Sequence, residues 1–148
     1  MDHKETAVQY FQSGFNCAQS VFAAYADELG LQKDHALKIS TGFGGGMARL
    51  QKTCGAVTGS FMVLGLKYGK DSDGDDSARD KTYKLVRIFA DRFTAQHGTL
   101  ECSKLMGCDL NTPEGQLYSR EYNLHANVCT QCIKTAAVLL DELLKSAE

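Results

Sequence analysis

The chain contains 148 residues, of which 43% are hydrophobic, with one proline and no tryptophan. A chain of this length buries roughly 68 to 70% of its unfolded surface, so a single domain over 1–148 can form its core without disulfide bonds. Its formal net charge of −2, with both signs interspersed, offers no basic surface for nucleic acid or for an anionic membrane. We therefore expect neither partner.

The N-terminal segment MDHKETAVQYF is polar and lacks the apolar core of a signal peptide, and no apolar run approaches the ~20 residues of a membrane span. We therefore expect a cytoplasmic protein. In a reducing cytoplasm, the six cysteines of this chain indicate metal binding or thiol chemistry more often than structural disulfides.

Apolar residues recur at helical spacing through the first half of the chain. The pattern predicts a helix from Thr6 to Gly14, a helix over 17–29, a shorter helix capped by Asp34, and a helix that starts near Thr53. Asn16 is a favourable N-cap for the second helix, and Gly30 is placed to end it. Within the fourth helix, Gly55 and Gly59 leave a low face against which another helix can pack closely.

The second half of the chain also predicts helices. They are a helix over 77–96, a short helix capped by Thr99 that ends at Gly107, a helix from Pro113 to about Tyr122, and a last helix capped by Asn127. The buried face of the 77–96 helix is predicted to include Tyr83 and Phe89.

The aspartate-rich run over 70–76 only superficially resembles a calcium loop, so a solvated turn with Asp76 or Ser77 as the N-cap is favoured. No segment alternates polar and apolar residues as a half-buried strand does. The fold class that follows is all-α: a single-domain bundle of about five to seven helices with a glycine-rich loop.

Four cysteines fall within the first turn of separate predicted helices, namely Cys17, Cys54, Cys102 and Cys129. At a helix N-terminus, unpaired N–H groups and the helix dipole stabilise a thiolate and can lower its pKa from about 8.5 to as little as ~3.5. Each of these cysteines also lies on the apolar face of its helix, so all four are expected to point inward. A thiolate is both the nucleophile of disulfide exchange and a ligand for soft metals.

Cys129 and Cys132 form a C-x-x-C pair, which can close a short disulfide or ligate one metal. A thioredoxin-like protein would place this pair in a βαβ context, which is absent here. No second C-x-x-C is present, so an all-cysteine zinc site of familiar spacing is disfavoured. An iron–sulfur cluster held by scattered cysteines stays open, because it leaves no local spacing to recognise.

The central motif TCGAVTG at 53–59 follows GFGGGM at 42–47, and FNCAQ at 15–19 and CSKLMG at 102–107 flank them on either side. With the final Cys129, these segments make the chain resemble a family of small helical bacterial and archaeal proteins named for its C, GCAxxG, C, C pattern. Here Cys54 precedes the first glycine of that motif instead of following it. The resemblance implies that Cys17, Cys54, Cys102 and Cys129 are the family cysteines, with thiol redox activity or metal ligation as their function and no substrate named.

The glycine-rich loop is a candidate site for an anionic cofactor, through Gly44, Gly45, Gly46 and Arg49. No strand precedes it and its spacing matches no P-loop or dinucleotide motif, so the favoured interpretation is that the glycines let the loop pass close to the cysteines. His125, four residues before Cys129, is a candidate base or ligand, although a partly exposed loop histidine is favoured.

Three hypotheses follow. The first is a thiol-dependent oxidoreductase that acts with an unidentified redox partner and is centred on Cys54, its catalytic thiols being Cys17, Cys54, Cys102, Cys129 and Cys132. The second is a protein that binds an iron–sulfur cluster or another soft metal through Cys17, Cys54, Cys102 and Cys129. The third is a structural module with buried reduced thiols, such as a helical homodimer packed on the face of Gly55 and Gly59.

Overall fold

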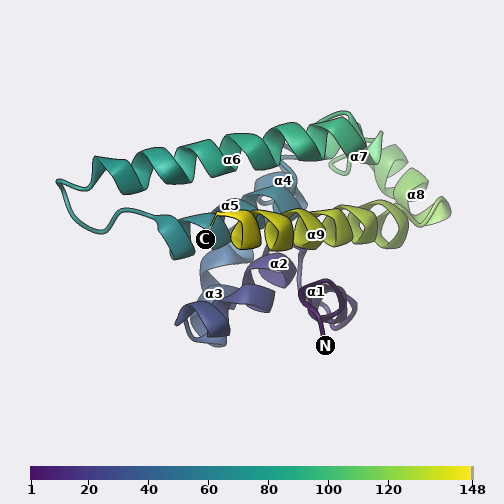
Figure 1. Ribbon diagram of the computed structural model, residues 1–148. Coiled ribbons are helices and arrows are strands. Elements are labelled where there is room, and N and C mark those ends of the chain that lie inside the picture. Colours follow the sequence, from purple (N-terminus) through teal and green to yellow (C-terminus); the bar gives the residue numbers. More distant parts are fainter. Residues whose placement is uncertain (148) are drawn as a thin grey trace.

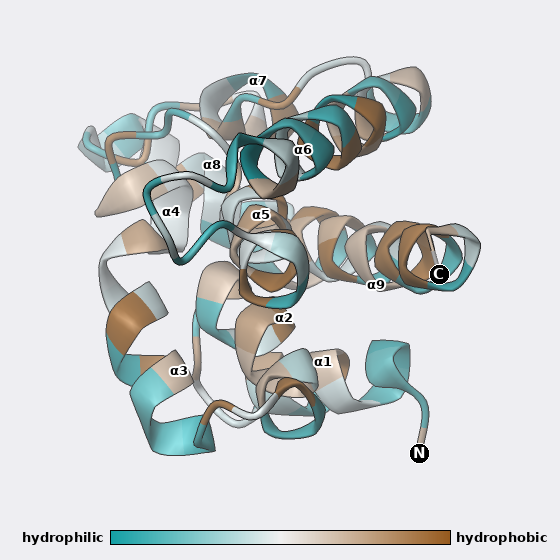
Figure 2. Cartoon of the chain, turned by 60° about the vertical axis from the view of Figure 1, so that its left-hand side comes forward, coloured by the Kyte–Doolittle hydropathy of each residue, from teal (hydrophilic) through white to brown (hydrophobic). Residues whose placement is uncertain are grey.

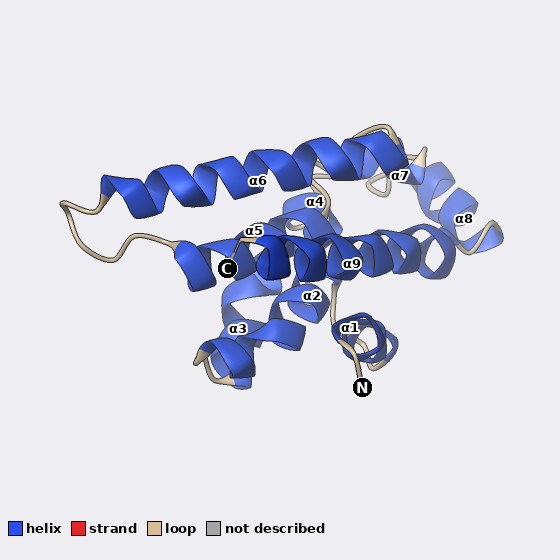
Figure 3. Cartoon of the chain, viewed as in Figure 1, coloured by secondary structure: helices blue, strands red, loops and turns tan. Residues whose placement is uncertain are grey.

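The computed structural model describes residues 1–147 and contains no β-strand within that range (Figure 3). The prediction of an all-α fold is therefore confirmed. The longer helices are α1 (His3–Gln12), α2 (Cys17–Ala26), α3 (Lys33–Ser40), α5 (Gly55–Tyr68), α6 (Asp76–His97), α8 (Pro113–Glu121) and α9 (Thr130–Ser146). Shorter elements are α4 (Gly44–Met47), α7 (Cys102–Met106), 3₁₀ turns at Asp27–Leu29 and Thr41–Phe43, and a π-helical turn at His125–Cys129.

The helices stack in layers (Figure 1). In that view α6 lies along the top, α5 and α9 form the middle layer, and α1, α2 and α3 lie below. The core is built from large side chains of four helices, including the fully buried Tyr25, Leu64, Phe89 and Leu140. Figure 2 shows long hydrophobic stretches on α2 and α9, whereas much of α6 is hydrophilic. Burial of these apolar faces holds the layers together.

Two of the predicted N-caps are present. Asn16 and Gln19 form a capping box, with Gln19 N donating to Asn16 Oδ1 at 2.9 Å and Asn16 N donating to Gln19 Oε1 at 3.0 Å. Thr112 Oγ1 accepts a hydrogen bond from Gly115 N at 3.0 Å, ahead of α8. Each such cap stabilises its helix by about 1 kcal/mol, which explains why these helices start where the sequence predicts.

The low face of α5 is in contact with α2. A Cβ added at Gly59 would lie 2.8 Å from the carbonyl oxygen of Ala18, and one added at Gly55 would lie 3.0 Å from the Ala18 nitrogen. The prediction of a closely packed neighbour is confirmed, and that neighbour belongs to the same chain. The idea of a homodimer packed on this face is therefore wrong, because α2 already covers it.

Several predicted caps and one predicted core residue need correction. Gln32, not Asp34, is the N-cap of α3, and Asp34 lies in the first turn of that helix. Asn127 does not cap the last helix, because its backbone N–H donates to Asn123 O at 2.9 Å inside a turn that starts earlier in the chain. Glu101, not Thr99, is the N-cap of α7; the Thr99 hydroxyl accepts from Glu101 N at 3.1 Å instead. Tyr83 is 62% exposed, since α6 packs against the middle layer through Leu85, Phe89 and Phe93.

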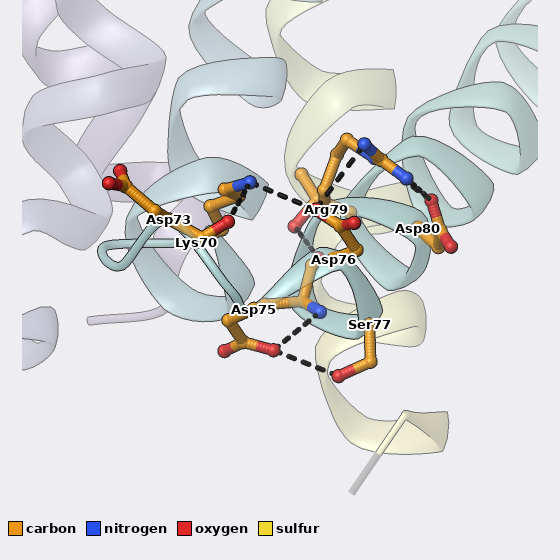
Figure 4. A network of polar contacts seen from close by, with 9 residues as sticks. Lys70, Asp73, Asp75, Asp76, Ser77, Arg79 and Asp80 are labelled. Atoms are coloured by element: carbon orange, nitrogen blue, oxygen red, sulfur yellow. Dashed lines mark hydrogen bonds and ion pairs between the residues drawn. The ribbon is translucent and has the colours of Figure 1, made fainter.

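The aspartate-rich run forms the exposed turn between α5 and α6 (Figure 4). Lys70 Nζ contacts Asp76 Oδ1 at 3.0 Å and the Asp73 carbonyl at 3.1 Å. A lysine of the turn itself therefore contacts its acidic residues. Asp75, not Asp76 or Ser77, is the N-cap, and its carboxylate accepts from Ala78 N at 3.2 Å.

Within residues 1–147, no helix combines the length and the apolar character that crossing a bilayer requires.

The contact between α2 and α5 can be tested with two glycines of the same helix. We expect Gly59→Ala to destabilise the fold by about 1–3 kcal/mol, because the new methyl group meets the backbone of α2. Gly65→Ala is the matched control: apart from its own turn of helix, no atom lies within 4 Å of its added Cβ, so the better helix propensity of alanine should stabilise by about 0.5–1 kcal/mol. Urea unfolding followed by circular dichroism measures both, and effects of the same sign would contradict the packing described.

Candidate functional site

A pocket of about 710 Å³ lies among α2, the glycine turn, α5, α7, α8 and the start of α9. In Figure 1 the start of α9 lies at the same end of the molecule as α7 and α8. Five of the six cysteines line this pocket, namely Cys17, Cys54, Cys102, Cys129 and Cys132. These are the five thiols proposed from the sequence, and they come together from four separate parts of the chain. Cys108 is half-buried and does not line the pocket.

Two extended segments position Cys54 and Cys102 side by side. Cys54 N donates to Leu100 O at 2.8 Å, and Cys102 N donates to Lys52 O at 2.6 Å, around an antiparallel bridge between Thr53 and Glu101. Each segment then turns directly into a helix, so both thiols stand at a helix start. The bridge is too short to give a strand pattern in the sequence.

The glycine-rich loop forms a left-handed turn along the pocket wall. Every residue from Gly45 to Arg49 has a positive φ, between 53° and 69°. A left-handed conformation costs roughly 1–2 kcal/mol for a residue with a side chain, and here Met47, Ala48 and Arg49 adopt it. A Cβ at Gly46 would lie 2.7 Å from Cys102 Cβ, so glycine lets the backbone pass against the thiol segment, as the favoured interpretation predicts.

Cys129 and Cys17 form the first thiol pair. Hydrogen bonding from Cys17, and then from His125, lowers the pKa of Cys129 to about 5 despite its burial. The same contact with Cys129, together with burial, raises the pKa of Cys17 well above the ordinary thiol value. The pair therefore holds one negative charge on Cys129 and one proton on Cys17 at neutral pH.

Cys54 and Cys132 form the second pair, in which again the pKa of one thiol is lowered and that of the other is raised. Hydrogen bonding from Cys132, and contacts with the backbone N–H groups of Ala56 and Val57, lower the pKa of Cys54. The hydrogen bond to Cys54 and burial raise the pKa of Cys132. Cys102 belongs to neither pair: burial raises its pKa to about 12, so it stays a neutral thiol.

The helix-start interpretation is only partly correct. Cys17 and Cys102 are the first residues of α2 and α7, and Cys54 is the N-cap of α5. Cys129 instead lies at the end of the π turn, inside a continuous helical segment, so it has no free helix N-terminus beside it. Burial and thiol partners, more than helix dipoles, decide which sulfur carries the charge.

His125 is exposed, as the favoured interpretation predicts, but it lies in the π turn and not in a loop. Its ring packs against Phe11 with ring centroids 4.5 Å apart. A hydrogen bond with Cys129 raises the pKa of His125, so imidazolium and thiolate stabilise each other. The spacing of four residues between His125 and Cys129 is that of neighbours on one helical face. The sequence alone does not show that this face borders the pocket.

The expected metal-ligand set gains no further support from side-chain geometry. Across the described residues, no three or more Cys, His, Asp or Glu side chains are grouped as ligands for one metal ion. The sulfurs stand in pairs instead, and Cys129 Sγ also contacts Met106 Sδ at 3.9 Å.

Comparison with known families gives a match. The family model described as putative redox-active protein (C_GCAxxG_C_C) matches residues 15–143, a range that contains the whole pocket. No curated protein and no solved structure matches the chain.

The assignment of the thiolate can be tested by alkylation. We expect Cys129 to react with iodoacetamide with an apparent pKa of about 5, and we expect His125→Gln to move that pKa upward because the imidazolium is lost. His35→Gln removes an exposed histidine outside the pocket and should leave the profile unchanged. Peptide mass spectrometry across pH measures the site and the rate, and an unshifted profile in the His125 variant would contradict the role given to that residue.

Proposed function

The chain belongs to the C_GCAxxG_C_C family, and from this premise we propose that it is a thiol-dependent oxidoreductase in which Cys129 attacks and Cys17 resolves. The observation that carries the proposal is the Cys17 and Cys129 pair, with a stabilised thiolate on the less buried sulfur. Cys17 is 7% exposed, whereas Cys129 is half-buried at the pocket wall. An incoming disulfide therefore reaches Cys129 first.

The reaction proceeds in two exchanges. The Cys129 thiolate attacks one sulfur of the substrate disulfide, a new bond forms between them, and the substrate S–S bond breaks to release one thiolate. Cys17 then attacks Cys129 Sγ, the second substrate sulfur leaves, and the Cys17 proton goes to a departing thiolate. The two cysteines lose two electrons and become a disulfide, and the substrate disulfide gains these electrons and leaves as one thiol and one thiolate, the thiolate then taking a proton from the solvent. An external dithiol reductant must return the protein to its starting state.

Cys54 and Cys132 provide a second dithiol in the same pocket, again with one lowered and one raised pKa. Both of its sulfurs are buried, with 6% and 1% exposure, so they are reached after Cys129. We assign Cys102 no exchange step, because it is hydrogen-bonded to Gln51 and not to a thiolate, and burial raises its pKa to about 12.

This chemistry fits a reducing compartment. All six cysteines are free, and a cytoplasmic location would keep the two pairs available as dithiols between turnovers.

The order of attack can be tested by trapping. On treatment of the reduced protein with one equivalent of 2-hydroxyethyl disulfide, we expect a Cys17–Cys129 disulfide and no stable adduct. Cys17→Ser should accumulate the mixed disulfide on Cys129, because the resolving sulfur is gone. Cys102→Ser is the matched control and should still close the disulfide. Intact mass and peptide mapping give the answer, and a first adduct on any other cysteine would contradict the assignment.

The same preparation tests the metal hypothesis. Protein purified anaerobically should be colourless and free of stoichiometric metal. A stoichiometric iron–sulfide absorption spectrum would overturn the dithiol proposal, since the sulfurs would then be ligands.

A further inference from the structure

The pocket that holds the thiol pairs is cationic. Two arginines, Arg49 and Arg120, line it together with His125, and none of its lining residues in the described chain is Asp or Glu. Neither guanidinium forms an ion pair or a side-chain hydrogen bond with a described residue. By contrast, Arg79 and Arg92 elsewhere on the surface each contact a carboxylate. The pocket thus holds two guanidinium groups that no carboxylate of the described chain pairs with.

Arg49 is held in place by its backbone. It stands in a left-handed conformation, with φ of 62°, and its carbonyl accepts from Asn111 Nδ2 at 2.9 Å. Its side chain lies along Gly45, where an added Cβ would come within 2.9 Å of Arg49 Cγ. The loop therefore fixes the direction in which the Arg49 side chain leaves the backbone, so that it lies along the pocket wall.

Arg120 reaches the pocket from α8. That helix packs tightly on the preceding loop, because a Cβ at Gly115 would lie 1.7 Å from Asp109 O, so only glycine fits. The loop is held in turn by Gln51, whose side chain donates to Cys108 O at 3.0 Å and accepts from Leu110 N at 2.8 Å. Two cationic groups from unrelated segments thus converge on one pocket.

We propose that the substrate of this site is a small disulfide bearing anionic groups, with Arg49 and Arg120 binding the anionic groups while Cys129 attacks the S–S bond. The inference rests on the proposed function. A pocket of about 710 Å³ has the size of small-molecule sites. Its inner wall, with the sulfurs, Leu105 and Met106, suits the S–S bond and short alkyl arms, and guanidinium groups bind carboxylates in a bidentate geometry.

The test compares three symmetric disulfides that differ in charge. They are the dianionic disulfide of mercaptoacetate, the neutral disulfide of 2-mercaptoethanol and the dicationic disulfide of cysteamine. Each rate of exchange with the reduced protein is divided by the rate of the same disulfide with a small free thiolate, which removes differences in intrinsic reactivity. We expect the normalised rate to be roughly tenfold higher for the dianionic probe than for the dicationic one, and to converge at high salt.

Substitutions show which positive charges produce the preference for the dianionic probe. Arg49→Gln with Arg120→Gln should abolish the preference for the dianionic probe while exchange with the neutral probe persists. Arg87→Gln with Lys84→Gln also removes two positive charges, from the exposed face of α6 outside the pocket, and should keep the preference. Circular dichroism confirms that each variant is folded.

The outcomes separate the two proposals. Equal normalised rates for all three probes would overturn the anionic substrate and leave the dithiol chemistry standing. A protein disulfide that exchanges faster than every small probe would also overturn it, in favour of a macromolecular partner. If none of the disulfides reacts with Cys129, the proposed function itself fails.

Discussion

The close approach of α2 and α5 at Ala18 is the contact on which the pocket depends. With glycine at both 55 and 59, the two helix backbones meet without side chains between them. The same approach sets Cys17 against the start of α5, since a Cβ on Gly55 would lie 3.1 Å from Cys17 Cβ. The sulfurs of Cys17 and Cys54 thereby line the same pocket. Larger residues at these glycines would widen the gap between the helices and separate the thiols.

The second constraint is that two sulfurs in contact inside a buried pocket cannot both be thiolates. Like charges in a low-dielectric site disfavour each other, so each sulfur pair keeps one proton. In both pairs the lowered pKa belongs to the sulfur with additional hydrogen-bond donors: His125 for Cys129, and backbone N–H groups for Cys54. Cys102 has no thiol partner, and burial leaves it neutral. The environment therefore gives chemically identical residues very different pKa values.

The left-handed turn connects the thiol chemistry to the charge of the pocket. Strained backbone persists only where its surroundings determine it, and here Gln51, Asn111 and the Cys102 segment all hold the turn. The turn closes one wall over the sulfurs and projects Arg49 along it. A right-handed helix over the same residues would direct these groups elsewhere, which gives the glycines at 45 and 46 a positional role.

Much of this arrangement was open to prediction from the sequence. Helical periodicity and the caps at Asn16 and Thr112 fixed the all-α fold, because such signals act over a few residues and need no tertiary partner. Cysteines on apolar faces predicted inward-pointing sulfurs, and the glycine spacing in α5 predicted a close helix neighbour.

Tertiary structure alone decided which sulfurs meet, where the charge resides and which cations surround it. The pKa of Cys129 is lowered to about 5 although it has no free helix N-terminus, because this pKa depends on Cys17, more than a hundred positions away in the chain. Arg49 and Arg120 likewise line one pocket only because the tertiary fold brings their two segments together. A sequence specifies local conformation through neighbouring residues, but the protonation of a buried thiol depends on groups brought to it by the packing of distant helices.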